Sequence, residues 1–87
     1  MKKRVAIIGV TGSVGQEFVQ SLNDHPWFEV TQIAASERSA GKMYLDAIRD
    51  PSGIIAWDVG GEIPEYIKSM KVLKVEEVNV QELDLIF

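Results

Sequence analysis

The sequence contains a glycine-spaced turn near its start that directly follows an apolar run. The run covers residues 5–8 (VAII), and the turn at residues 9–15 has the spacing G-x-x-G-x-x-G. A buried strand that enters such a turn and then a helix is typical of dinucleotide-binding folds. The spacing differs from the commoner G-x-G-x-x-G, and a tight strand-to-helix turn without a ligand would also produce it. The predicted strand before the turn and the predicted helix after it favour dinucleotide binding.

Each glycine of this turn has its own predicted role. Gly9 permits the sharp turn after the strand, Gly12 lets backbone N–H groups approach a pyrophosphate, and Gly15 lets the helix pack close to the sheet. The start of the helix, predicted at Ser13, adds unpaired N–H donors and the positive end of the helix dipole. The motif therefore predicts that phosphates bind over the start of this helix.

Composition limits the other possibilities. The 87 residues are 46% apolar and 25% charged, which fits at most one small globular domain, and the net charge of −4 argues against nucleic acid as a partner. No apolar run approaches the roughly 20 residues of a membrane span, and the basic start lacks a signal-peptide core, so we expect a cytoplasmic protein. The chain has no cysteine, and its single histidine, His25, has no partner at metal-ligand spacing. We therefore predict neither a metal site nor a cysteine nucleophile within this chain.

The remaining pattern predicts an α/β fold with a Rossmann-like, doubly wound parallel sheet. We expect strands at residues 4–8, 28–35, 71–75 and 83–87, a small additional strand at 54–57, and helices at 13–23, 43–49 and 63–70. In the first helix, four apolar positions are expected to face the sheet: Val14, Phe18, Val19 and Leu22. Trp27 and Phe28 are expected to pack in the core. Because the sequence stops inside the fourth strand, we expect an incomplete sheet and interpret residues 1–87 as the N-terminal portion of a dinucleotide-binding domain in a longer protein.

The end of the second predicted strand is where such folds contact the adenosine ribose. The sequence there contains Ser36, Arg38 and Ser39. Two hydroxyls and a guanidinium suit a 2′-phosphate, which carries about −1.5 to −2 charges, and they favour NADP as the cofactor. Glu37 would repel that phosphate and favour NAD if it turned inward. Alternatively, Arg38 is a solvated loop residue that pairs with Glu37.

Several segments together resemble aspartate-semialdehyde dehydrogenases. They are the turn at 9–15, the loop at 34–42 (AASERSAGK), and the segments at 25–29 (HPWFE) and 63–67 (IPEYI). The segments match in order over nearly the whole chain and point to the archaeal and fungal branch, and the nine-residue loop is far more specific than the glycines. Val10 departs slightly from this pattern, because the family usually has alanine at that position.

The resemblance implies an oxidoreductase of amino-acid biosynthesis that reduces aspartyl phosphate to aspartate semialdehyde with NADPH and acts as a homo-oligomer. It also implies that the turn holds the pyrophosphate and that the loop holds the 2′-phosphate. The predicted cofactor-binding residues are Gly9, Thr11, Gly12, Ser13, Val14, Gly15, Ser36, Arg38 and Ser39. The family's catalytic cysteine, general-base histidine and substrate arginines would lie beyond Phe87, so we expect the 87 residues alone to be inactive.

Two other interpretations remain open at this stage. A related acyl-CoA or acyl-phosphate reductase, such as malonyl-CoA reductase, would share the cofactor domain and differ in an acyl pocket that this chain lacks. A stand-alone nucleotide-binding module could act as a sensor without chemistry. Residues 50–61 look longer than the family's usual version, and the sequence assigns them no role.

Overall fold

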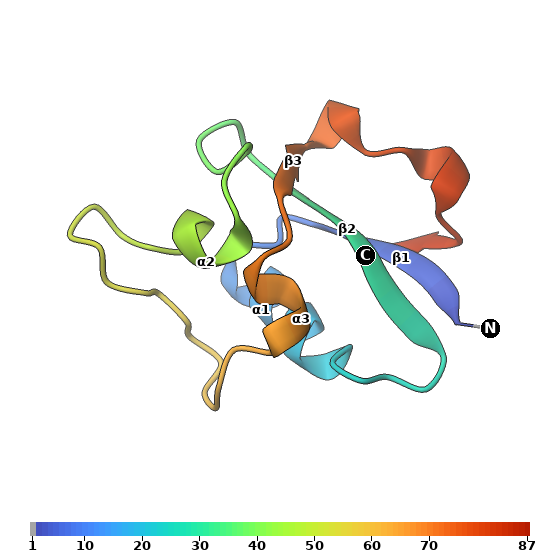
Figure 1. The fold of residues 1–87 in the computed structure, drawn as a ribbon, viewed down its shortest axis with the longest axis horizontal. Helices are drawn as coiled ribbons and strands as arrows, with labels where there is room; N and C mark the ends of the chain where they lie inside the picture. Colours follow the sequence, from blue (N-terminus) through green and yellow to red (C-terminus); the bar gives the residue numbers. More distant parts are fainter. Residues whose placement is uncertain (1) are drawn as a thin grey trace.

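A four-stranded parallel sheet forms the centre of the molecule in the computed structural model, which describes residues 2–87 (Figure 1). The strand order is β3-β2-β1-β4, and every pairing is parallel. The chain therefore adds β2 and β3 on one side of β1 and then crosses back to add β4 on the other, which confirms the predicted doubly wound sheet. The strands are β1 (Lys3–Ile8), β2 (Phe28–Ala35), β3 (Val72–Lys74) and β4 (Leu85–Ile86).

Short helices connect these strands. The α-helices are α1 (Ser13–Ser21), α2 (Tyr44–Ala47) and α3 (Glu65–Lys68), and two 3-10 helices, η1 (Val75–Glu77) and η2 (Val80–Glu82), lie between β3 and β4. All three α-helices are shorter than predicted. The prediction of an additional strand at 54–57 was wrong, because within this segment only Ile55 forms a bridge, which is antiparallel to Arg49. No helix among residues 2–87 is long and apolar enough to cross a bilayer.

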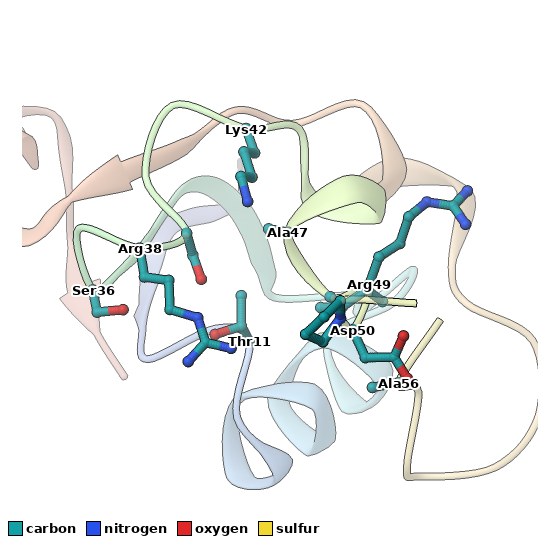
Figure 2. A pocket seen from close by; sticks show the side chains of 11 residues that line it. Thr11, Ser36, Arg38, Lys42, Ala47, Arg49, Asp50 and Ala56 are labelled. Carbon is teal, nitrogen blue, oxygen red and sulfur yellow. The ribbon is translucent and has the colours of Figure 1, made fainter. Parts of the chain in front are cut away.

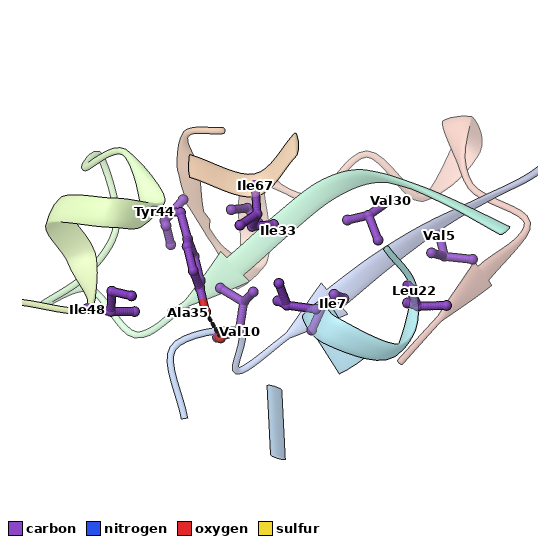
Figure 3. Close-up of a cluster of buried hydrophobic side chains, with 12 residues drawn as sticks. Val5, Ile7, Val10, Leu22, Val30, Ile33, Ala35, Tyr44, Ile48 and Ile67 are labelled. Carbon is purple, nitrogen blue, oxygen red and sulfur yellow. Dashed lines mark hydrogen bonds between the residues drawn. The ribbon is translucent and has the colours of Figure 1, made fainter. Parts of the chain in front are cut away.

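The core lies between the central strands and the helices, as Figure 3 shows. The central strands are buried as a parallel sheet requires, since Val5, Ala6 and Ile7 of β1 and Ile33 of β2 are fully inaccessible to solvent. Tyr44 of α2 reaches across this core, and its hydroxyl donates a hydrogen bond to the Val10 carbonyl at 3.3 Å. This contact fixes α2 against the turn that follows β1.

The face of α1 that meets the sheet differs from the prediction at one position. Val14 was expected to face the sheet, but it is 72% exposed. The helix instead turns Gly15, Val19 and Leu22 inward. These three residues lie three and four positions apart and share one helical face, whereas Val14 lies about 100° around the helix from Gly15. The close approach at Gly15 thus sets the rotation of the helix.

The start of β2 also differs from the prediction. Trp27 was expected in the core with Phe28, but it is 70% exposed, and its ring meets that of His25 in an edge-to-face arrangement. It immediately precedes β2, in the connection that follows α1. Phe28 does pack against the core, and its ring meets that of Phe87 edge to face. Only the second aromatic residue of the pair therefore contributes to the core.

Alkaline pH is expected to destabilise the fold through Tyr66. Its hydroxyl donates to the Val19 carbonyl at 2.8 Å, and burial raises its pKa from 10.0 to about 12. Between these two pH values the folded state holds more protons than the unfolded chain, so the free energy of unfolding falls as pH rises. Burial shifts the pKa of Tyr44 in the same direction.

Thermal melts between pH 8 and 11.5 will test this expectation. Tyr66→Phe should lower stability by about 0.5–1.5 kcal/mol at neutral pH, because the hydrogen bond to Val19 is lost. It should also make the alkaline decline shallower. A decline equally steep in the variant would show that the Tyr66 phenol does not cause it.

Candidate functional site

The turn between β1 and α1 is bound to the end of the neighbouring strand. The N–H groups of Gly9 and Val10 both donate to the Ala34 carbonyl of β2, at 2.9 and 3.1 Å. Gly9 has a φ of +73°, a left-handed conformation that glycine adopts without strain. This confirms the predicted role of Gly9 in the sharp turn. Gly12 is the N-cap of α1, and no side chain in the described part of the chain caps the helix there.

Contacts within the chain require glycine at position 15 but not at position 12. A Cβ on Gly15 would lie 2.2 Å from the Gly9 carbonyl oxygen and 2.7 Å from the Val10 Cα, so no other residue fits. The predicted close packing at Gly15 is therefore confirmed. A Cβ on Gly12 would meet the Gly9 oxygen at 3.7 Å, an ordinary contact. Packing within the chain therefore does not require glycine at position 12. That Gly12 lets backbone N–H groups approach a pyrophosphate stays a prediction.

A pocket of about 370 Å³ opens at the carboxyl ends of β1 and β2 (Figure 2). One wall contains Thr11 from the glycine turn together with the loop that follows β2. The other wall comes from α2 and the segment after it. The lining residues are Thr11, Ser36, Arg38, Ser39 and Lys42 on the first wall, and Ala47, Ile48, Arg49, Asp50, Pro51 and Ala56 on the second.

Four of the nine predicted site residues line the pocket, and the other five do not. Thr11 meets the three loop residues predicted to hold a 2′-phosphate, although the two segments are far apart in the sequence. The other five lie in the turn and the first turn of α1 and do not line this pocket: Gly9, Gly12, Ser13, Val14 and Gly15. The sequence prediction missed the whole second wall and Lys42.

Cationic side chains dominate the charged groups of the pocket. Figure 2 shows Arg38 extending toward Thr11 and Lys42 pointing into the space between the walls. Among residues 2–87, neither cation forms an ion pair, so the pairing of Arg38 with Glu37 that the alternative interpretation requires is absent from the described chain. Arg49, in contrast, pairs with Asp46 at 3.4 Å. Arg38 and Lys42 are therefore the cations available to an anionic ligand.

The acidic residue in the lining is occupied within its own turn. The Asp50 carboxylate accepts hydrogen bonds from the Ser52 hydroxyl at 2.6 Å, the Ser52 N–H at 2.9 Å and the Ile54 N–H at 3.0 Å. The Ser52 hydroxyl, with these N–H groups, lowers the pKa of Asp50. The sequence DPSG at residues 50–53 is typical of such a turn, but no local pattern places this turn against the glycine turn.

Comparison with known proteins identifies relatives over nearly the whole chain. Residues 4–87 match the semialdehyde dehydrogenase NAD-binding domain. The aspartate-semialdehyde dehydrogenase of Archaeoglobus fulgidus is 37% identical over 87 residues, which are 100% of this chain and 23% of that protein. That of Saccharomyces cerevisiae is 37% identical over 86 residues, covering 99% of this chain and 22% of the yeast protein. The chain thus spans less than a quarter of the length of these curated relatives.

Solved structures show the same similarity in three dimensions. Aspartate-semialdehyde dehydrogenase with NADP from Candida albicans superposes with a TM-score of 0.83 at 38% identity, over 100% of this chain and 23% of the Candida chain. Aspartate-semialdehyde dehydrogenase II from Vibrio cholerae superposes with a TM-score of 0.62 at 26% identity, over 99% of this chain and 20% of that one. The archaeal and fungal matches agree with the branch that the sequence segments indicate.

Proposed function

The chain belongs to the semialdehyde dehydrogenase NAD-binding domain family, and on this premise we propose that residues 1–87 form the N-terminal portion of the NADP-binding domain of an aspartate-semialdehyde dehydrogenase. The complete enzyme would reduce aspartyl phosphate to aspartate semialdehyde. The share of each relative that the chain covers, 22–23%, supports a partial domain, with the catalytic residues located elsewhere. NADPH would supply the hydride, and this part of the protein would bind and orient it.

One observation carries the proposal. The pocket places Thr11 of the glycine turn beside Ser36, Arg38 and Ser39, at the carboxyl ends of two adjacent parallel strands. Dinucleotides bind at this edge of such sheets, with the pyrophosphate at the first helix and the adenosine ribose at the end of the second strand. The donors present fit this cofactor, because two hydroxyls and a guanidinium that has no ion-pair partner among residues 2–87 suit a 2′-phosphate.

The proposal assigns a part of the cofactor to each group of residues. The uncapped start of α1, with Thr11, Gly12, Ser13 and Val14, would bind the pyrophosphate through backbone N–H groups. Gly9 and Gly15 would act by shaping the turn. Ser36, Arg38 and Ser39 would bind the 2′-phosphate, and Lys42 would add a second positive charge in the same pocket. The complete enzyme would act in the cytoplasm as a homo-oligomer.

Cofactor titration and turnover will test this function. In the complete protein, NADPH should bind at least about tenfold more tightly than NADH, because one charge-assisted hydrogen bond contributes roughly 1.5–3 kcal/mol. The complete protein should reduce NADP when it is given aspartate semialdehyde and phosphate. The absorbance of the NADPH that forms measures this reaction. The 87-residue chain, which has no cysteine, should show no turnover. Equal affinities would contradict the assigned cofactor, and turnover with a different acyl substrate alone would favour a related reductase.

A further inference from the structure

Gln16 is a buried amide that neither the sequence prediction nor the proposed cofactor contacts explain. It lies on α1, is 1% exposed, and is the one buried polar side chain among the described residues 2–87. Its Nε2 donates to the carbonyls of Thr11 at 3.1 Å and Ala56 at 2.9 Å. Its Oε1 accepts from the Asp58 N–H at 2.7 Å. The amide nitrogen and the amide oxygen thus both have hydrogen-bond partners, and all three partners are backbone groups.

The two carbonyls that Gln16 binds belong to opposite walls of the pocket. Thr11 lies on the wall formed by the glycine turn, and Ala56 lies on the wall formed by residues 47–56. One amide group therefore connects the two walls. Gln16 itself does not line the pocket, so any influence on a ligand must pass through these neighbours.

The segment that follows α2 has other attachments, one to α2 itself and one to Gln20 of α1 through the Gly60 carbonyl. The Ala56 N–H donates to the Ile48 carbonyl at 2.8 Å, beside the bridge between Arg49 and Ile55. The bond to α2 keeps the segment folded on itself. Because Tyr44 fixes α2 to the glycine turn through the Val10 carbonyl, this bond anchors the beginning of the segment, whereas Gln16 holds residues 56–58. Loss of the Gln16 contacts is therefore expected to let residues 56–58 move away from Thr11 while the segment stays attached to α2.

We propose that Gln16 is a positioning residue for the dinucleotide, which holds residues 56–58 against the glycine turn and so closes the pocket around the adenosine end. This inference rests on the proposed function. It gives the segment at 50–61 a role, as the far wall of the adenosine site. When the closed form becomes only partly populated, apparent affinity falls in proportion. The loss should affect the adenosine end and leave the nicotinamide end unchanged.

The test compares Gln16→Met with Gln20→Met in the complete protein. Gln20 lies one helical turn later and also binds the segment, with Nε2 donating to the Gly60 carbonyl at 3.0 Å, but Gly60 does not line the pocket. Gln16→Met should weaken binding of NADPH and of adenosine 2′,5′-bisphosphate about tenfold by calorimetry. Gln20→Met should change both less than twofold. Reduced nicotinamide mononucleotide should bind both variants as it binds the wild type.

Hydrogen exchange of residues 50–61, followed by mass spectrometry, gives a readout that does not depend on cofactor binding. Exchange should be faster in Gln16→Met. Faster exchange with unchanged affinity would overturn the positioning role, and so would unchanged exchange. If the wild type binds no dinucleotide, the proposed function fails, and exchange still shows whether Gln16 holds the segment.

A second variant covers the case in which Gln16→Met does not fold. Asp58→Pro leaves Gln16 in place and removes the N–H that donates to it, and the Asp58 side chain is exposed. It should weaken adenosine 2′,5′-bisphosphate several-fold. Unchanged affinity in a folded Asp58→Pro protein would overturn the inference.

Discussion

Gly15→Ala is expected to destabilise the protein severely, by at least about 3 kcal/mol. Overpacking in a core typically costs roughly 1–3 kcal/mol because side chains can shift. Here the added Cβ would lie 2.2 Å from the Gly9 carbonyl oxygen and less than 3.0 Å from two Val10 backbone atoms. Backbone atoms cannot change rotamer, so α1 would have to move away from the sheet. The core contact of Val19 with the sheet would be lost with it.

Gly12→Ala is the matched control for this experiment. It adds the same methyl group to the same turn, but its Cβ would meet the Gly9 oxygen at 3.7 Å, an ordinary contact. Alanine is a poorer N-cap than glycine, so we expect a cost of about 1 kcal/mol or less. Thermal melting and the soluble yield of both variants will show whether Gly15→Ala is the more destabilising. Similar melting temperatures for the two variants would show that α1 can move away from the turn at little cost.

Arg38→Ala is expected to weaken NADPH binding about 10- to 150-fold. The guanidinium extends toward Thr11 in the pocket and, among the described residues, has no ion-pair partner, so its charge is available to the 2′-phosphate (Figure 2). A charge-assisted hydrogen bond is worth roughly 1.5–3 kcal/mol, and each 1.4 kcal/mol is about tenfold in affinity. NADH lacks this phosphate and should bind Arg38→Ala almost as it binds the wild type.

Two further variants separate the contribution of the phosphate from a general loss of the site. Arg38→Lys keeps the charge and should recover part of the NADPH affinity, since lysine binds phosphate as a point charge. Gly12→Val should weaken both cofactors alike, because the pyrophosphate is common to them. Calorimetric titration of both cofactors against each variant provides the measurement. Equal losses of NADPH and NADH in Arg38→Ala would mean that the loop after β2 does not select the cofactor.

Local sequence signals were sufficient for the elements around the glycine turn. The structure has β2 at Phe28–Ala35, as predicted, and α1 begins at Ser13, as predicted. The reason is that a continuous apolar run, a proline before the next strand and the spacing of glycines act within a few residues. The close approach at Gly15 follows from the same local pattern, since the turn itself brings the helix back onto β1.

Contacts between distant segments were not predictable in this way. The exposure of Val14 depends on how α1 is rotated against the sheet. The periodicity of apolar residues predicted the helix correctly but wrongly placed Val14 on its buried face. Residues 54–57 resemble a strand locally, yet no strand within residues 2–87 pairs with them, and Ile55 alone forms a bridge there. An isolated apolar run becomes a strand only when a partner offers its backbone hydrogen bonds.

The sequence by itself determined that this chain folds as a strand, a glycine turn and a helix in a parallel sheet, and which loop follows β2. Only the tertiary structure decided that residues 47–56 form the opposite wall of the pocket and that Gln16 joins the two walls. The physical reason is that the Gln16 amide binds Ala56 and Asp58, which lie some forty positions away in the chain. No local pattern specifies such a partner, because it depends on where the folded sheet brings the segments together.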